Sequence, residues 1–429
     1  MKMEKLRNHF TKFYLLLVLI APLTPRFSSA DKTITHWITL TLAAGLGLIL
    51  TLVYKNKQMF VKDYFFYPVY FYFSFLIIAV FSSFFAINQV ESLIAISRII
   101  VILVHIYLFY SLEVYKLLNI KTVALAASSL LLIEIILSIN PLYKILPITK
   151  YDIAFATEFL LGIEGNKNIT SASIITKIPF AIMLFDNSKN KIIKCLAILT
   201  IFLGVLNVLF LSARASYLSL FLILIILISY NYFKQMKLFN LDFFRNYKYL
   251  ILIPFLSYLI YSNSLPEDST ISIDKRYSSI VSYENDNSIN DRLRYYSQAI
   301  DYAIKNPLMG AGIGNWKIIS IKLDGANITS YVVPNVLHND FLEILGETNL
   351  VGMLSYILFF ISMLYILFKR LSKTNHLPLY VILSLLAFLV DSSFNFPLYR
   401  ASMQVNLLII VIFVLMFHND TKPSFNYEK

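Results

Sequence analysis

Charged side chains are scarce in this sequence. Only 14% of its 429 residues are Asp, Glu, Lys or Arg, whereas 58% are hydrophobic and the mean hydropathy is +0.68. Soluble globular domains carry roughly 25% charged residues, so this shortage excludes a soluble protein. Many apolar runs reach the roughly 20 residues that a helix needs to cross a bilayer. The composition therefore predicts an all-α, polytopic membrane protein.

Cysteine and several catalytic motifs are missing as well. Cys195 is the one cysteine, which excludes an internal disulfide and a cluster of thiolate metal ligands. The histidines are scattered, and no HExxH, no Walker A loop and no GxGxxG with an acidic partner occurs. We expect no metal and no cofactor, and ATP-driven transport and metalloprotease chemistry have little support.

The apolar runs predict about twelve membrane-spanning helices. They lie near residues 13–30, 34–53, 65–86, 93–111, 120–139, 170–185, 192–211, 214–230, 247–262, 338–368, 377–392 and 401–417. The first run is similar to a signal peptide, with a basic start and a small-residue end, but we favour a retained span.

Basic residues gather in every second loop. The basic stretches lie near residues 2–12, 55–62, 116–121, 189–194, 234–248 and 369–373. Because cytoplasmic loops are the basic ones, this pattern places these loops and both termini in the cytoplasm. Most of the net charge of +12 therefore sets orientation in a membrane, and we expect no nucleic-acid partner.

Two longer segments, residues 140–169 and 263–337, fall on the opposite side. The second divides the chain into helices at 1–262, an extramembrane loop domain at 263–337 and helices at 338–429. Within it, NDRLRYYSQAIDYAIKNP predicts an amphipathic helix that is capped by Asn290 and ends at Pro307 and GAGIG. Its expected apolar face consists of Leu293, Tyr296, Ile300, Ala303 and Ile304.

Arg214 interrupts the apolar stretch 208–224. The loop charges place LSAR in a tight outer turn between two spans, so its guanidinium lies at the membrane–water boundary. There it is either an interfacial arginine that snorkels into water or a ligand for phosphate, which a planar guanidinium can contact through two hydrogen bonds.

His338 stands where the extramembrane segment re-enters the bilayer. A histidine at such a boundary either has a structural role or accepts a proton from an attacking hydroxyl. Glu343 and Glu347 follow one and two turns later, as buried partners or as helix polarity.

Other polar residues are expected at the same outer depth. Arg292 lies on the amphipathic helix, and Asn168 in the turn GNKN either caps the next span or binds sugar hydroxyls. Arg98 and Lys177 fall in the outer halves of their spans and should face the bundle interior, as should Glu134. Several cations beside one histidine suit a site that binds a lipid-linked diphosphate and uses it as leaving group.

Five stretches of the sequence carry a family resemblance through their order and spacing. They are GNKNITSASIITKIPF, LSARASYLSL, SINDRLRYYSQAIDYAIKNPLMGAGIGNW, LHNDFLEILGETNLVG and DSSFNFPLYR. Together with the layout of most of the chain, they resemble the O-antigen ligase/polymerase superfamily of bacterial membrane glycosyltransferases. Asn349 replaces a usual glycine, a mild change because Asn tolerates left-handed backbone, and Tyr296 stands where the family often has Trp.

The resemblance implies an activity and a set of site residues. An O-antigen ligase moves a glycan from undecaprenyl diphosphate to a hydroxyl of lipid A–core at the periplasmic face of the inner membrane, and this reaction is expected to be inverting and metal-independent. Arg214 and Arg292 would bind the diphosphate, and His338 would activate the acceptor hydroxyl. The candidate supporting residues are Asn339, Glu347, Arg98, Lys177, Asn168 and Arg294.

Alternative functions remain open at this stage. A polymerase would join one lipid-linked glycan to another, and a protein O-oligosaccharyltransferase would use Ser or Thr hydroxyls; the shared motifs bind the shared donor and do not discriminate. A flippase for lipid-linked sugars is the alternative from another class. The long loop and the lack of a visible internal repeat argue against a transporter.

Overall fold

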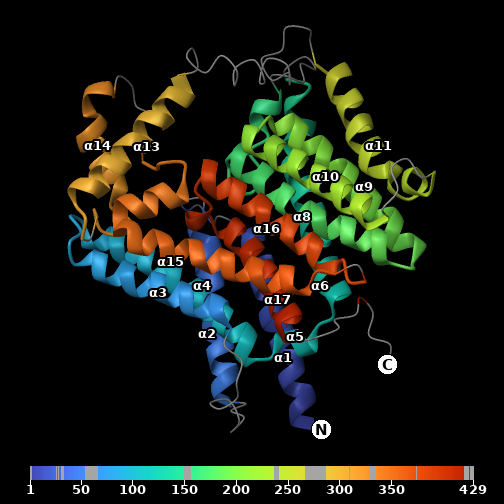
Figure 1. The fold of residues 1–429 in the computed structure, drawn as a ribbon, viewed down its shortest axis with the longest axis horizontal. Helices are drawn as coiled ribbons and strands as arrows, with labels where there is room; N and C mark the ends of the chain where they lie inside the picture. Colours follow the sequence, from blue (N-terminus) through green and yellow to red (C-terminus); the bar gives the residue numbers. More distant parts are fainter. Residues whose placement is uncertain are drawn as a thin grey trace. The chain divides into compact units, whose positions relative to one another are not determined.

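The computed structural model describes residues 2–25, 27, 29, 33–53, 66–148, 156–235, 241–265, 287–308, 310–328, 335–372, 374–419 and 425. Within these ranges the chain forms helices and no strand, which confirms the predicted all-α class (Figure 1). Its internal contacts group it into two units, each assembled from separate stretches. Unit 1 comprises residues 1–117, 282–366 and 392–419, and unit 2 comprises residues 118–281, 367–391 and 420–429. The linear division at 263 and 338 stays a prediction.

Most helices belong wholly to one unit. Unit 1 holds α1 (Lys2–Ile20), η1 (Ala21–Leu23), α2 (Ile34–Val53), α3 (Tyr67–Ser83), α4 (Gln89–Ser111), α5 (Val114–Leu117), α13 (Asn287–Lys305), α14 (Trp316–Asp324), η4 (Gly325–Asn327), η5 (Pro397–Tyr399) and α17 (Ala401–Asn419). Unit 2 holds α6 (Ile120–Ile145), η2 (Thr157–Phe159), α8 (Lys167–Asn187), α9 (Lys191–Leu211), α10 (Arg214–Gln235) and α11 (Leu241–Asn263). The residues of α15 (Asp340–Arg370) up to Ile366 are in unit 1, and those of α16 (Leu377–Phe394) up to Asp391 are in unit 2.

Many of these helices are built to cross a membrane. Among the described residues, eight are long and apolar enough: α2, α4, α6, α8, α9, α15, α16 and α17. Shorter apolar helical stretches occur in α3, α10 and α11. The chain is therefore a multi-pass membrane protein, and each predicted span overlaps a helix, although α1 ends ten residues before the predicted end of the first span. The count of about twelve spans stays a prediction.

Asparagine side chains begin several helices. The Oδ1 atoms of Asn88, Asn166 and Asn190 accept hydrogen bonds from the second backbone N–H of the helix that follows, over 3.0, 2.9 and 2.8 Å. Such caps satisfy N–H groups that have no partner inside the helix. The prediction of Asn168 as a cap was wrong: Asn166 is the cap, and Asn168 is the second residue of α8. Of the predicted turn GNKN, Gly165 ends a turn and Asn166 is the cap, whereas Lys167 and Asn168 already belong to α8.

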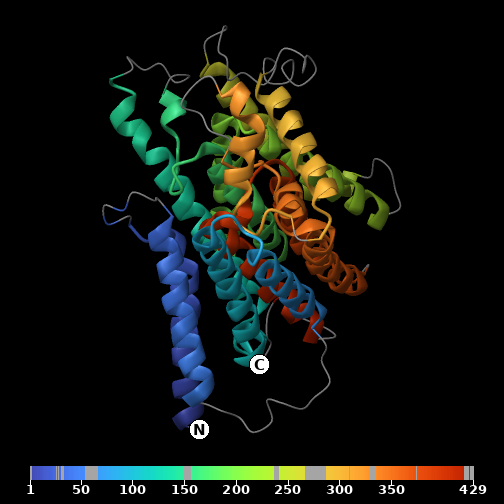
Figure 2. The same ribbon diagram turned by 90° about the vertical axis from the view of Figure 1, so that its left-hand side faces the viewer.

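The last helix of unit 1, α17, lies in the interior of that unit. Residues 401–417 of α17 are buried, and α17 packs against α2, α4, α5 and η5. Figure 2 shows the neighbouring pair α1 and α2 side by side. Tyr14 of α1 hydrogen-bonds His105 of α4 over 2.8 Å, and His105 also contacts the carbonyl of Leu40. Polar groups inside the apolar unit thus satisfy one another, as burial requires.

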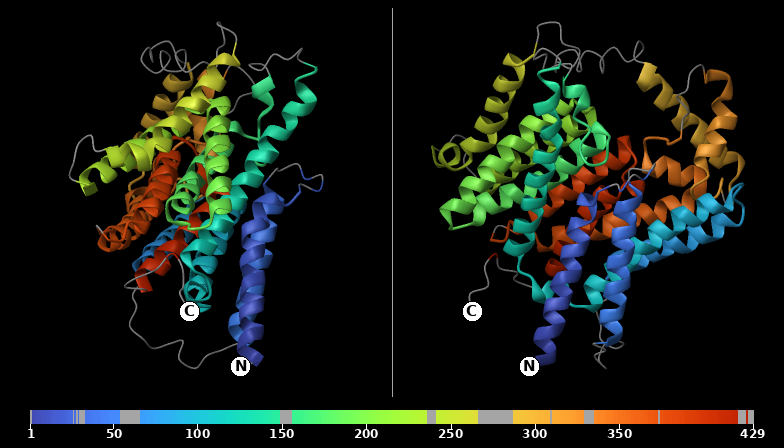
Figure 3. Two further views of the ribbon diagram at one scale, coloured as in Figure 1. Left: turned by 90° about the vertical axis from the view of Figure 1, so that its right-hand side faces the viewer. Right: turned by 180° about the vertical axis from the view of Figure 1, so that it is seen from behind.

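The interior of unit 2 surrounds α8, which is buried from Ile169 to Leu184 and packs against α6, α9 and α10 (Figure 3). Lys177 of α8 forms an ion pair of 2.9 Å with Glu134 of α6, and both side chains are almost completely buried. Lys177 Nζ also donates to the carbonyl and hydroxyl oxygens of Ser173. The two charges therefore face the interior, as predicted.

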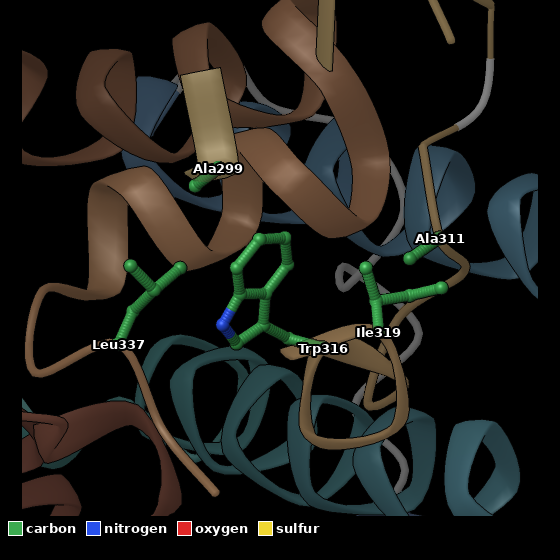
Figure 4. Close-up of a cluster of buried hydrophobic side chains, with 5 residues drawn as sticks. All are labelled: Ala299, Ala311, Trp316, Ile319 and Leu337. Carbon is green, nitrogen blue, oxygen red and sulfur yellow. The ribbon is translucent and has the colours of Figure 1, made fainter. Parts of the chain in front are cut away.

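The predicted amphipathic helix exists, but its boundaries and buried face differ from expectation. It is α13, which begins at Asn287 rather than after Asn290. Leu293, Ile300 and Ile304 are exposed. Ala303 of the predicted face is buried, as is Ala299, which was not predicted. Ala299 joins a cluster around the Trp316 ring of α14 (Figure 4). The cluster members are Ala299, Ala311, Trp316, Ile319 and Leu337, with Tyr295, Tyr296 and Tyr302 packed against them.

The glycine-rich turn after α13 is docked on α15. Gly310, Gly312 and Gly314 all have positive φ angles, and an added Cβ on Gly312 would lie 2.6 Å from the Cβ of Ala86. Ala311 N–H and the N–H of Gly312 donate to the carbonyls of residues 346 and 347 over 2.9 Å each. Only glycine combines these angles with such close approach, so the sequence GAGIG fixes this contact.

The carbonyls that receive the turn are available because α15 is broken at Asn349, where φ is 65° and ψ is −173°. An unbroken helix would bond Gly346 O to the N–H of Leu350. Here Leu350 N–H donates to Asn349 Oδ1 over 2.6 Å, and Gly346 O accepts from the turn. The kink thus exchanges intrahelical hydrogen bonds for contacts with the loop.

Candidate active site

Arg214 is the first residue of α10 in unit 2. α9 ends at Leu211, Ser212 adopts a left-handed φ of 54°, and α10 begins two residues later. Tyr217 OH donates to the carbonyl of Leu209 over 2.8 Å across the turn. The predicted two-span reading of this stretch is confirmed: the guanidinium is at a helix boundary and not in the middle of a membrane helix.

The other two principal residues, Arg292 and His338, lie in unit 1. His338 immediately precedes α15 and has a positive φ of 57°, which is unusual for a residue with a bulky side chain. Neighbouring groups hold the backbone around it: Leu337 N–H donates to Glu343 Oε2 over 2.8 Å, and Tyr296 OH donates to the carbonyl of His338 over 3.2 Å. These contacts fix the imidazole at the start of α15.

The His338 ring lies among cations and one aromatic ring. It meets Phe396 edge-on with 5.2 Å between ring centroids, and Arg400 lies 4.7 Å from the centroid of the same ring. Burial, and then the charges of Arg292 and Arg400, lower the pKa of His338 to about 4. The imidazole is therefore neutral near pH 7. Within the described residues its Nδ1 is buried and has no hydrogen-bond partner.

Arg292 is anchored beside this ring by the backbone. Its guanidinium donates to the carbonyl of Phe394 over 3.2 Å, in the segment that leads to η5. This hydrogen bond orients the planar guanidinium group, which has five N–H donors in all. His338 and Arg292 are thus brought together within unit 1, as the proposed roles require.

Two glutamates tie α15 to the loop. Glu347 accepts from the backbone N–H of Trp316 over 2.8 Å and from Tyr399 OH over 3.3 Å. Glu343 accepts from Leu337, as described above, and both carboxyl groups are buried. The hydrogen bonds of the predicted supporting residue Glu347 therefore connect α15 with α14 and η5.

The remaining candidate residues have varied surroundings. Arg294 donates two hydrogen bonds to Asp324, from Nε to Oδ1 over 2.7 Å and from Nη2 to Oδ2 over 3.1 Å. This bidentate contact lowers the pKa of the Asp324 carboxyl group. Asn339 caps α15 through the N–H of Leu342 at 3.1 Å. Arg98 of α4 lies 5.4 Å from the centroid of the Trp37 ring. In unit 2, Lys177 is held in its buried ion pair.

A cavity of about 470 Å³ opens in unit 1 next to these residues. Val336, two residues before His338 in the chain, and Phe396, whose ring contacts that of His338, both line it. Its charged lining residues are Glu91, Arg98, Lys317, Glu343, Glu347 and Arg400. Its volume is in the range of small-molecule sites.

A comparison with known protein families gives a match over the part of the chain that contains the three principal candidate residues. Residues 199–357 match the family described as O-antigen ligase, and this segment contains Arg214, Arg292 and His338. This match supports the resemblance of the chain to the O-antigen ligase/polymerase superfamily. No curated protein matches the chain. The predicted resemblance to this superfamily is confirmed.

Sequence reasoning missed three residues of the site. Arg400 and Tyr399 lie in DSSFNFPLYR, a stretch that carried the resemblance but to which no role was assigned. Lys317 follows the glycine-rich turn and pairs with Glu91. A signal was present for Arg400, because an arginine at the end of an apolar span is costly in lipid and is expected to face a polar partner.

Proposed function

We propose that this protein is an O-antigen ligase-like glycosyltransferase. It moves a glycan from undecaprenyl diphosphate to a hydroxyl of lipid A–core at the periplasmic face of the bacterial inner membrane. The observation that carries the proposal is the neutral His338 imidazole, fixed at the start of α15 with Arg292 beside it, in a chain whose family match spans both residues. The family match implies lipid-linked glycan substrates.

The proposed reaction is a single displacement. The acceptor oxygen attacks the anomeric carbon, the bond from that carbon to the diphosphate oxygen breaks, and the anomeric configuration inverts. His338 accepts the proton of the hydroxyl as general base. The electron pair leaves on the diphosphate, whose growing charge Arg292 and Arg214 neutralise.

The charges around His338 suit this sequence of events. In the free protein, burial and then the charges of Arg292 and Arg400 lower the pKa of His338. An anionic diphosphate bound at Arg292 would offset that effect, so donor binding raises the basicity of the imidazole. The base thus becomes stronger when the donor is in place.

A reconstituted transfer assay tests the assignments. With labelled undecaprenyl-diphosphate glycan and lipid A–core, His338→Ala should lose at least about 100-fold in rate, the usual contribution of a general base. Arg214→Ala should weaken donor binding more than acceptor binding. The exposed His9→Ala on α1 is the matched control and should retain full activity. Full activity in His338→Ala or Arg214→Ala would overturn the assigned roles, and inhibition by EDTA would contradict the metal-independent mechanism.

The acceptor is tested by a deletion strain. Loss of a ligase leaves polymer that never reaches lipid A, whereas loss of a polymerase leaves single repeat units attached to it. Loss of glycans from Ser and Thr of proteins would identify a protein O-oligosaccharyltransferase. The first phenotype is the one that the ligase proposal requires.

A further inference from the structure

The cavity of unit 1 has a lining that the donor roles of Arg214 and Arg292 do not use. Residues of both kinds line it: the carboxyl-bearing Glu91, Glu343 and Glu347, and the cations Arg98, Lys317 and Arg400. Glu91 and Lys317 are joined as an ion pair. The carboxyl groups of Glu343 and Glu347 already accept hydrogen bonds from the protein. The wall therefore places hydrogen-bond acceptors beside cationic donors.

Mixed charge of this kind suits hydroxyl groups. A sugar hydroxyl can donate to a carboxylate and accept from a guanidinium or ammonium group, and each such hydrogen bond to a charged partner is strong. A ligand without hydroxyl groups would leave the polar groups of the cavity without hydrogen-bond partners, so it would bind more weakly. The lining therefore matches a neutral, hydroxyl-rich ring.

Aromatic faces hold the arginines in place. The guanidinium of Arg98 stacks at 5.4 Å from the centroid of Trp37, and that of Arg400 stacks at 4.7 Å from the centroid of Phe396. Trp37 is itself fixed, since its indole N–H donates to the carbonyl of Tyr399 over 3.3 Å. Because each guanidinium group already stacks on an aromatic ring, it can donate to a ligand with little further loss of side-chain entropy.

The cavity lies next to the proposed base. Phe396 contacts both the cavity and the His338 ring, and Asn335 and Val336 line the cavity immediately before the histidine in the chain. A ring bound there can bring one hydroxyl towards the imidazole. Its volume of about 470 Å³ is suited to a small group such as the end of a glycan.

We infer that this cavity binds the terminal, hydroxyl-bearing sugar of a glycan acceptor, with Arg98, Lys317 and Arg400 as acceptor ligands. This inference rests on the proposed function. It assigns the acceptor to unit 1 residues other than the arginines proposed for the donor, and it favours a glycan acceptor over a Ser or Thr side chain.

Steady-state kinetics in proteoliposomes separates the two substrates. The donor and the acceptor glycan are varied independently for Arg98→Gln and Lys317→Gln. Each variant should raise the KM for the acceptor roughly tenfold or more, as expected for loss of one charged hydrogen bond, and leave the KM for the donor within about twofold. Lys322→Gln is the matched control, because Lys322 is exposed on the same helix as Lys317 and does not line the cavity within the described residues.

The thermal midpoint of unfolding of each purified variant checks its folding. Arg98→Lys keeps the charge but not the planar guanidinium group, so its KM for the acceptor should lie between those of the wild type and Arg98→Gln. Wild-type transfer combined with cavity variants that change only the donor KM, or neither KM, overturns the inference and leaves the proposed function standing. Wild-type transfer to a Ser/Thr peptide but to no glycan also overturns it. Absence of any transfer by the wild type overturns the proposed function itself.

Discussion

Asn349 occupies backbone angles that almost only glycine adopts without strain. With φ at 65° and ψ near 180°, it lies outside the left-handed helical region that asparagine tolerates. Its side chain compensates by donating to the carbonyl of Asn306 over 3.1 Å and by accepting from Leu350 N–H. The replacement of the family's glycine is therefore mild because of these hydrogen bonds, and not because of intrinsic tolerance of the angles.

Substitution of Asn349 separates backbone strain from the side-chain contacts. Asn349→Gly should be close to neutral, since relief of strain offsets the loss of two hydrogen bonds. Asn349→Ala keeps the strain and loses the contacts, so it should cost about 2 kcal/mol. Thermal unfolding in detergent measures both. Equal stability of the two variants would show that the kink is not strained.

His338 gives the reaction a distinct pH dependence. Because burial and two arginines lower its pKa from 6.5 to about 4, the ring stays neutral at pH values where an ordinary histidine takes up a proton. We expect kcat/KM for the donor to be flat through pH 6.5 and to fall only as the pH approaches 4. A fall centred near 6.5 in the pH–rate profile would contradict the buried, cation-flanked environment.

The same shift predicts a change in stability. Between pH 6.5 and about 4 the unfolded chain binds a proton at His338 that the folded chain does not, so protonation favours unfolding in this window. Stability should therefore fall as the pH is lowered through it. His338→Gln, which does not titrate, should show a smaller fall when unfolding is followed at each pH, and an identical fall would exclude this histidine as a cause.

At the scale of elements, the ion pair between Glu134 and Lys177 joins α6 to α8. Lys177→Met alone leaves a buried carboxyl group without its cation and should destabilise unit 2 by roughly 3 kcal/mol. The double variant Glu134→Leu/Lys177→Met should recover most of that loss, because apolar side chains replace both charges. Thermal unfolding checks this, with exposed Lys191→Met as the control. A double variant as unstable as the single one would contradict a purely structural pair.

Helix positions were largely predictable from the sequence, because apolar length is a local signal. The division of the stretch around Arg214 into two helices was found from loop charge alone, and the structure agrees. The start of α13 was missed because the polar residues 287–290 resemble a cap as much as a first turn. Part of its buried face was missed because the partner is Trp316, whose position depends on three glycines and on the break in α15.

The site was predictable only in part, for a related reason. His338 and Arg292 stood out because their residue types fit the chemistry and the resemblance. The bracing of His338 by Glu343 and Tyr296, and the cavity beside Arg400, depend on contacts between segments far apart in the chain. Periodicity and spacing carry no information about such contacts.

At the scale of the whole molecule, the protein combines apolar, multi-pass helices with polar groups concentrated where the loop meets α15. Unit 1 holds the neutral imidazole of His338, the anchored Arg292 and the mixed-charge cavity. This arrangement within unit 1 supports the proposed enzyme over a flippase, because a proton acceptor beside an arginine suits activation of a hydroxyl and stabilisation of a leaving diphosphate.

The most direct test follows both products in proteoliposomes that contain the purified protein, labelled undecaprenyl-diphosphate glycan and lipid A–core, with EDTA present. The account predicts that undecaprenyl diphosphate appears in step with glycosylated acceptor, that the new linkage has inverted anomeric configuration, and that no net movement of donor lipid across the bilayer is required. Movement of intact donor across the bilayer without release of undecaprenyl diphosphate would contradict it.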